Sequence, residues 1–189
     1  SRNIAGDGKF DQNSVPTSLE VSVGRIDFSN MSDFAPLNEV DLLKRYFRKN
    51  HSYRQRIFTV PKRGFIDDGF GDFLGQAFSS STWNALNTLV GGANRDTRPY
   101  FFDVMPKTPY LWASAFGGGT DSSIGGLKPD PDGSGPLTGV GTSADFAAQP
   151  NLGVFNTCFG SYFGDFNRAN NVMRAMIAGD GYALTNFWT

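Results

Sequence analysis

Cysteine and histidine are scarce in this sequence: its 189 residues include one of each, Cys158 and His51. A single cysteine excludes an internal disulfide framework, and a single histidine leaves no Cys/His cluster with the spacing of zinc ligands. A cysteine nucleophile also needs an adjacent imidazole, because a free thiol with a pKa near ~8.5 is mostly protonated at neutral pH. The positions of these two residues therefore decide whether cysteine catalysis is available.

Net charge and long apolar runs are lacking as well. Lys and Arg together number 17 against 18 for Asp and Glu, which gives a net charge of −1. This balance provides no long-range field to attract nucleic acid or anionic lipid, so neither is an expected partner. No apolar run reaches the roughly 18 residues that span a bilayer, and the polar segment after Ser1 is unlike a signal peptide.

Phenylalanine and glycine are abundant, with 18 and 23 copies. Large aromatic side chains combined with Gly-rich loops favour an extracellular enzyme or an assembly protein. The length predicts one compact domain over residues 1–189. Because the chain has no initiator Met and stops on a strand-like apolar stretch, residues 182–189, we expect it to be part of a longer protein.

The first half of the chain predicts a strand, a helix and a second strand. Residues 19–26 alternate apolar with polar or small side chains, as in a strand. Apolar residues recur at helical spacing over 36–49, with charges on the other face, which predicts an amphipathic helix. Residues 56–60 are apolar and β-branched and end at Pro61, which predicts a buried strand. This order predicts a right-handed crossover with parallel pairing.

The second half continues the alternation of strands and helices. It predicts short helices at 73–78 and 83–89, strands at 110–116, 153–159 and 182–188, and a helix at 168–178. Residues 125–150 are rich in Gly, Pro, Ser and Asp, which predicts a long loop. The predicted fold is a three-layer α/β domain, with a mostly parallel sheet and helices on both faces.

Chemically versatile residues follow three of the predicted strands. In such a sheet, ligands bind where the strands end. The candidate binding residues at these ends are Asp67, Asp68, Gly117, Gly118, Gly119 and Asp165. The glycines could hold an anion with backbone amides, whereas the carboxylates could bind a divalent cation or form an acid/base pair. Turn and helix-cap roles are the competing interpretation of each Asp.

Calcium is the one cofactor that the sequence raises, at two places. Asp7 and Asp11 alternate around Lys9, but a cation in the position of an oxygen ligand favours a polar turn there. The turn from Asp67 to Asp72 is the other place. No further metal or cofactor site is predicted.

Four segments, taken in order, resemble gingipain-type cysteine peptidases. The strand end Val23-Gly24-Arg25-Ile26-Asp27 leads into a helix as it does in that family, and Asp67-Asp68-Gly69 resembles the family's acidic strand end. Residues 115–120 resemble the strand end that carries the catalytic His, and residues 154–160 resemble the one that carries the nucleophilic Cys. The resemblance implies a caspase-like fold, secretion and Cys158 as the candidate nucleophile.

The departures from the family concern the catalytic pair. Gly118 stands where the family has its His, and His51 follows the first predicted helix, away from the strand ends. Cys158 lies at the nucleophile position or one residue before it, and adjacent strand residues face opposite sides of a sheet. Ser161 lacks the spacing of a nucleophile elbow and has no His to serve it. We therefore expect no catalytic dyad.

Three functions stay open at this point. The first is a gingipain-like domain without peptidase activity, a binding or structural module of a larger secreted protein whose partners are its other domains or a protein or peptide ligand. The second is an active cysteine peptidase that uses Cys158 with a base from outside this segment. The third is a self-assembling extracellular protein, since an open edge strand tends to pair.

Overall fold

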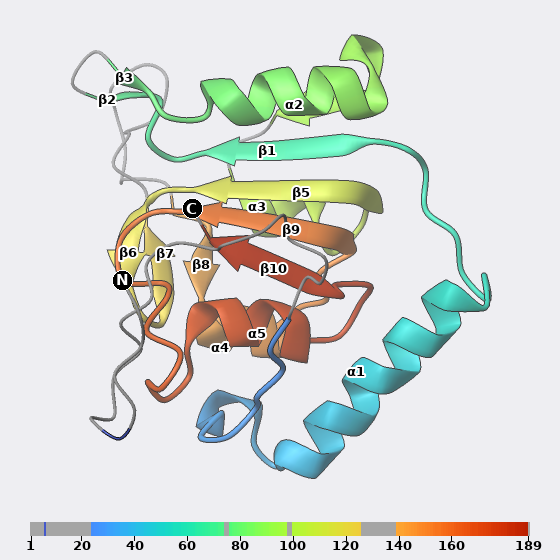
Figure 1. The fold of residues 1–189 in the computed structure, drawn as a ribbon, viewed down its shortest axis with the longest axis vertical. Coiled ribbons are helices and arrows are strands. Elements are labelled where there is room, and N and C mark those ends of the chain that lie inside the picture. Colours follow the sequence, from blue (N-terminus) through green and yellow to red (C-terminus); the bar gives the residue numbers. More distant parts are fainter. Residues whose placement is uncertain (1–5, 7–23, 74–75, 98–99, 126–138, 189) are drawn as a thin grey trace.

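A five-stranded parallel sheet forms the centre of the computed structural model (Figure 1). The structure describes residues 6, 24–73, 76–97, 100–125 and 139–188. The strands lie in the spatial order β10-β9-β5-β1-β4. Their bounds are Gly64–Asp68 (β1), Arg95–Thr97 (β4), Tyr110–Phe116 (β5), Gly153–Phe159 (β9) and Thr185–Trp188 (β10).

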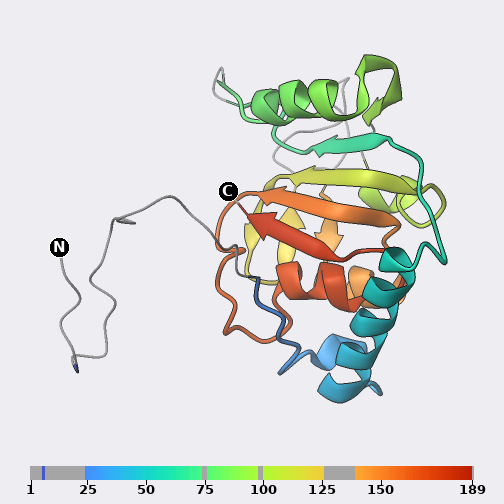
Figure 2. The same cartoon turned by 45° about the vertical axis from the view of Figure 1, so that its right-hand side comes forward.

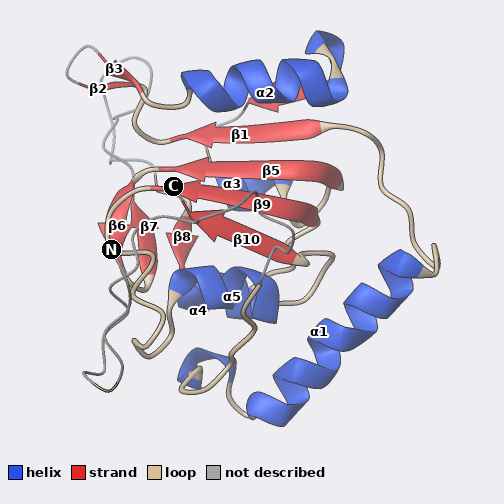
Figure 3. Ribbon diagram, in the orientation of Figure 1, coloured by secondary structure: helices blue, strands red, loops and turns tan. Residues whose placement is uncertain are grey.

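Helices cover both faces of this sheet, so the predicted three-layer α/β fold is confirmed (Figures 1 and 3). Helix α2 (Ser80–Val90) packs on one face over β1 and β4. The other face carries α3 (Phe101–Val104), α4 (Ser143–Ala148) and α5 (Val172–Ala178). Helix α1 (Glu39–Arg54) lies outside α5 and contacts it (Figure 2).

Shorter elements complete the fold. They are the hairpin β2–β3 (Asp72–Phe73 and Gln76–Ala77), the antiparallel sheet β6–β7–β8 (Gly118–Thr120, Ser123–Gly125 and Gly141–Thr142) and 3₁₀ turns at Ser32–Phe34 and Gly92–Asn94. In the described part of the chain, every helix is too short or too polar to cross a bilayer.

Several predicted elements are confirmed. Strands β5 and β9 coincide with the predicted ranges 110–116 and 153–159, and α2 contains the predicted helix 83–89. Helix α1 begins later than predicted, because Asn38 caps it in a reciprocal capping box with Asp41. The predicted helix 168–178 and strand 182–188 form over shorter ranges, as α5 and β10.

The predicted strand at 56–60 is wrong. Helix α1 extends to Arg54, so residues 56–60 form the connection to β1, and the strand lies at 64–68 instead. Arg56 has a φ of 55° and Ile57 is 71% exposed, neither of which suits a central strand. Residues 24–26 of the other early strand, predicted at 19–26, are irregular, and residues 19–23 lie outside the described residues.

Two other predictions of secondary structure need correction. The predicted helix at 73–78 is replaced by the β2–β3 hairpin. The predicted long loop at 125–150 contains β8 and helix α4, while residues 126–138 lie outside the described residues. Helix α4 forms because Thr142 and Asp145 make a capping box and Phe146 is fully buried on the sheet.

Candidate functional site

The three candidate segments do end at one edge of the sheet. Strands β1, β5 and β9 are neighbours, and their register aligns Asp68 with Phe116 and Phe116 with Phe159. The arrowheads of these strands lie together in Figure 1. The side chains at this edge nevertheless point to different places, and each has a structural partner or a buried position that limits what it can do.

Asp67 is buried on the face of the sheet that α3 covers. Its side chain is only 4% exposed, and its Oδ2 atom has no hydrogen-bond partner. Burial raises the pKa of Asp67 to about 7; the Asp68 charge adds to this effect, and a backbone hydrogen bond from Phe101 opposes it. Asp67 is therefore a buried carboxyl group whose ionisation destabilises the fold.

Asp68 points to the opposite face, toward α2. Its Oδ2 accepts a hydrogen bond from the Ser79 hydroxyl at 2.6 Å, and its Oδ1 accepts one from the Gly71 backbone N–H at 3.0 Å. The two adjacent carboxylates are thus separated by the strand itself. No group of three or more His, Cys, Asp or Glu side chains gathers anywhere in the described ranges. Asp7 and Asp11, the other calcium candidates, lie outside those ranges.

The triple glycine allows two strands to approach closely. A Cβ atom on Gly117 would lie 2.1 Å from the Gly125 carbonyl oxygen, and one on Gly119 would lie 2.1 Å from that of Ser123. The Gly117 N–H donates to the Phe159 carbonyl at 3.1 Å. Gly118 pairs with Gly125 in the β6–β7 hairpin. These contacts explain the glycines by backbone packing, without an anion.

Cys158 faces the core beneath α5. Its Sγ lies 3.3 Å from Met176 Sδ and 3.3 Å from Asn186 Oδ1, and its side chain is fully buried. Burial raises the pKa of Cys158 to about 12, against a smaller opposing effect of the hydrogen bond to Asn186. The thiol is therefore protonated at neutral pH and has no route to a substrate in this conformation.

The sole histidine is far from Cys158 along the sheet. His51 lies in the last turn of α1, two residues before Tyr53, whose ring packs on Phe155 near the start of β9. Cys158 lies at the other end of that strand.

Asp165 and Ser161 are exposed in the turn after β9. The Asp165 backbone carbonyl closes this turn by accepting a hydrogen bond from the Arg168 N–H at 3.1 Å.

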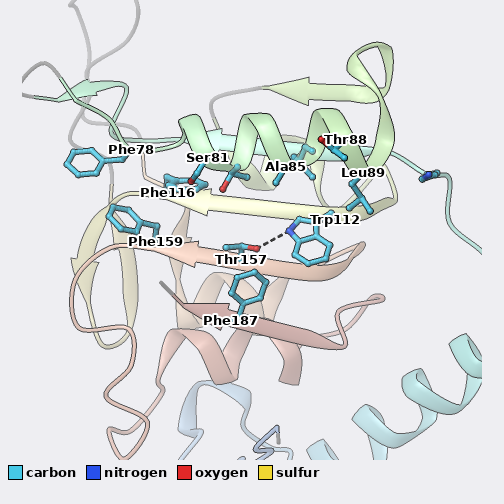
Figure 4. Close-up of a pocket in the computed structure, with 13 residues that line it drawn as sticks. Phe78, Ser81, Ala85, Thr88, Leu89, Trp112, Phe116, Thr157, Phe159 and Phe187 are labelled. Atoms are coloured by element: carbon cyan, nitrogen blue, oxygen red, sulfur yellow. Dashed lines mark hydrogen bonds between the residues drawn. The ribbon is translucent and has the colours of Figure 1, made fainter. Parts of the chain in front are cut away.

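A large cavity lies beside α2, on the face of the sheet that this helix covers, and we call it the apolar pocket (Figure 4). Among the described residues, α2 packs over β1 and β4 and the Tyr53 ring of α1 contacts Phe155 near the start of β9, so no described helix lies over the middle of β5 and β9. The resulting pocket has a volume of about 960 Å³. Its lining residues are Lys62, Phe78, Ser81, Thr82, Ala85, Leu86, Thr88, Leu89, Trp112, Phe116, Thr157, Phe159 and Phe187.

Aromatic rings form most of the floor of the apolar pocket. The Trp112 ring meets Phe187 edge-on, with 5.7 Å between ring centroids. Phe159 stacks on Phe78 at 5.4 Å and lies 5.8 Å from Phe116. Phe187 is 44% exposed even though its ring lies against the pocket floor. Such a set of rings offers edge and face contacts to a flat apolar group.

One hydroxyl group is fixed in the middle of these rings. The Trp112 indole N–H donates to Thr157 Oγ1 at 2.9 Å, as the dashed line in Figure 4 shows. Thr157 is buried and, among the described residues, its own O–H has no acceptor, so it is available to a ligand. Ser114, its register partner on β5, is fully buried with its Oγ unpaired.

The sequence did not lead to this pocket. Its signal is the run of aromatic and hydroxyl residues at alternate positions of β5 and β9, namely Trp112, Ser114, Phe116, Thr157 and Phe159. That alternation places the residues on one face of the sheet but cannot tell whether a helix covers them. Whether a helix covers these residues depends on the position of α2 in three dimensions.

The fold and the pocket together define a three-layer α/β protein with an open, aromatic sheet face. Comparisons of the chain with models of known protein families, with curated proteins and with solved structures give no match.

Proposed function

We propose that this chain is a binding module without peptidase activity and that the apolar pocket holds its ligand. The observation that carries the proposal is the pocket itself, with about 960 Å³ of space, aromatic walls and one fixed hydroxyl. Small-molecule sites in proteins are concave, span roughly 300–1,000 Å³ and combine apolar walls with few oriented polar groups. The apolar pocket has each of these properties.

The lining selects a class of ligand. A neutral molecule with an aromatic ring would contact Trp112, Phe159 and Phe187 through stacked or edge-on geometry. A hydrogen-bond acceptor on that ring would take the free O–H of Thr157. The ligand that fits best is therefore a flat apolar molecule with one acceptor group, and the aromatic side chain of a peptide shares that chemistry.

The state of Cys158 supports the non-peptidase part of the proposal. Peptidase chemistry requires a thiolate in contact with substrate and an imidazole to activate it. Cys158 has a raised pKa and a core position, and Gly118 occupies the place where the gingipain-type family has its His.

Kinship with gingipain-type peptidases and a place in a larger secreted protein are part of the proposal. Their support is the ordered set of strand-end segments, and the common edge of β1, β5 and β9 is compatible with it. In that case the ancestral strand-end site has been replaced by packing interactions, and binding has moved to the open face of the sheet.

Titration with N-phenyl-1-naphthylamine, a neutral aromatic probe, tests the binding function. We expect a saturable rise in probe fluorescence and a change in tryptophan emission. Substitution Ala85→Trp places a large ring into the pocket from an exposed position on α2, so it should weaken probe binding by about tenfold or more. Asn84→Trp, at the adjacent exposed position outside the pocket lining, is the matched control and should bind like the wild type.

Two results would count against the proposal. Equal probe affinity in the Ala85→Trp and Asn84→Trp variants would place binding elsewhere, and no saturable signal in the wild type would remove the ligand site. The same preparation is incubated with casein and a thiol-reactive activity probe. Casein turnover that is lost in Cys158→Ala would overturn the non-peptidase part.

A further inference from the structure

A second cavity lies between α1 and the turn that follows α5, and its walls are cationic. We call it the basic pocket, and its volume is about 420 Å³. It shares no lining residue with the apolar pocket. Its lining residues are Arg45, Arg48, Lys49, Ser52, Phe58, Asp180, Gly181 and Tyr182.

Lys49 is held rigidly in the wall of the basic pocket. Its side chain is only 8% exposed, and Nζ donates to the carbonyl oxygens of Ile177 and Gly179, both at 2.8 Å. Arg45 donates to the neighbouring Ala178 carbonyl at 3.4 Å. These carbonyls belong to the C-terminal end of α5, where the helix dipole favours cations. The two cationic groups are therefore positioned by backbone and need no carboxylate to hold them.

The cations of the basic pocket are not neutralised. Among the described residues, none of Arg45, Arg48 and Lys49 forms an ion pair. Asp180 is the single carboxylate in the lining, and its Oδ1 accepts from the Gly181 N–H at 2.8 Å. Burial and the Arg45 charge lower the pKa of Lys49 to about 7, and Asp180 opposes this only in part. The lining thus places three cationic side chains beside one carboxylate, which gives the basic pocket a net positive charge when Lys49 is protonated.

The lining also has the donors that an oxyanion requires. Guanidinium groups bind phosphate-type oxygens through paired N–H donors, and the Ser52 hydroxyl adds a further donor. Phe58 and Tyr182, which also line the pocket, stack with 4.2 Å between ring centroids and add an aromatic surface to it. We infer that the basic pocket binds a phosphate-type oxyanion through Arg45, Arg48 and Lys49. This inference does not depend on the proposed function of the apolar pocket.

Isothermal titration of the full chain with sodium phosphate and with sodium sulfate tests the site, and phenyl phosphate tests the aromatic wall. We expect saturable binding of the inorganic anions in the millimolar range and at least threefold tighter binding of phenyl phosphate. Arg48→Ala and Arg45→Ala should each weaken binding at least fivefold. Lys44→Ala, which removes an exposed cation of the same helix outside the pocket lining, should leave the affinity unchanged.

The pH dependence of sulfate binding tests Lys49 specifically, because sulfate keeps its charge across the range. The charged groups that act on Lys49 are Arg45 on its own helix and Asp180 after α5, with Arg48 also in the lining. Wild-type affinity for sulfate should fall at least threefold from pH 6 to pH 8.5, as Lys49 loses its proton. The fall should disappear in Lys49→Met and persist in His51→Gln, which removes the sole histidine without touching the lining.

Three results would overturn the inference. They are the absence of saturable heat with every anion, unchanged affinity in both arginine variants, and equal weakening by Lys44→Ala. Should Lys49→Met not fold, the Arg45 and Arg48 variants decide the question alone.

Discussion

Asp67 makes the stability of the protein depend on pH. Its carboxyl group is buried with one oxygen unpaired, and its pKa is raised to about 7, chiefly by burial. The unfolded chain releases this proton near pH ~3.9, so between about pH 4 and pH 7 the folded state binds more protons than the unfolded state. The contribution of this residue to stability therefore falls as the pH rises through that window and stays low above it.

Asp67→Asn should remove this penalty, because an amide is neutral at every pH and can still accept the backbone hydrogen bond. We expect the variant to be more stable than the wild type at pH 8, on the order of 1–3 kcal/mol, and to match it near pH 4. Urea unfolding at pH 4, 6 and 8 measures the difference. Asp103→Asn, at an exposed carboxylate, is the control. A difference that does not change with pH would contradict the raised pKa.

The sequence predicts which residues end the strands but not what surrounds their side chains. The sequence placed Cys158 and Gly117 at strand ends, which the structure bears out. Whether the thiol faced a cleft or the core depended on a one-residue shift in strand phase, which short motifs do not determine. The sequence allows an anion-binding role for Gly117 to Gly119, whereas the close approach of β7 explains Gly117 and Gly119 by backbone packing.

At the scale of elements, helix α4 is missed by overall composition but indicated by a local capping motif. The predicted loop 125–150 was inferred from overall composition, yet Thr142 and Asp145 form a capping box within it. Asp145 Oδ2 accepts from both the N–H and the hydroxyl of Thr142 at 2.8 Å. This spacing, Thr-x-x-Asp before a buried aromatic residue, is the sequence signal that identifies the helix.

Thr142→Ala should destabilise the protein by about 1 kcal/mol, because the backbone N–H of Asp145 loses its acceptor and Asp145 Oδ2 loses one of its two donors, the Thr142 hydroxyl. Urea unfolding measures this loss as a lower midpoint concentration of urea. The slope of the free energy of unfolding against urea concentration should stay unchanged. Thr59→Ala, at an exposed loop position, should change the midpoint by less than about 0.5 kcal/mol. Equal effects of the two substitutions would mean that the capping box contributes nothing.

In helix α1, the spacing of the apolar residues predicts the helix but not which of its residues are buried. Its helical spacing predicted the element correctly, but two residues of the predicted apolar stripe, Val40 and Phe47, are 56% and 55% exposed. The helix buries Leu42 and Tyr46, which broaden the predicted stripe, and also Lys49, which the pattern placed on neither face; the Tyr46 hydroxyl donates to the Leu184 carbonyl at 3.1 Å. A buried lysine breaks the apolar pattern, so the face that contacts α5 could not be recognised from hydrophobicity alone.

At the scale of the whole molecule, the sequence predicts the order of the layers. It does not predict which part of a sheet face the helices leave uncovered. Alternating strands and helices imply a parallel sheet with helices on both faces. How far one helix extends across its face depends on chain connections that sequence patterns do not specify. In the described part of the chain, α2 packs over β1 and β4 and the apolar pocket lies beside it, so the candidate site lies where no motif pointed.

A buried arginine holds residues 27–29 against the rest of the molecule, while Asn170 and the core residues Phe28, Met31 and Phe34 hold the residues that follow. Arg174 is 2% exposed, and its Nη1 donates to the Ser29 carbonyl at 2.6 Å and to Asp27 Oδ1 at 3.4 Å. Its Nη2 donates to the Arg168 carbonyl. Hydrogen bonds from the Ser29 hydroxyl and N–H contribute most to a pKa of about 2 for Asp27, so this carboxylate is charged at neutral pH.

Arg174→Met should therefore release residues 27–29 from α5 before it unfolds the sheet. We expect hydrogen exchange in peptides covering this segment to accelerate at least tenfold while β9 stays protected, and global stability to fall by about 2–3 kcal/mol. Arg168→Met is the matched control, since the Arg168 side chain is exposed and makes only a 3.9 Å ion pair with Asp121, and its backbone carbonyl is retained. If exchange in 27–29 and in β9 accelerates equally, the segment is an inseparable part of the core, and Arg174 serves general stability instead of anchoring this segment.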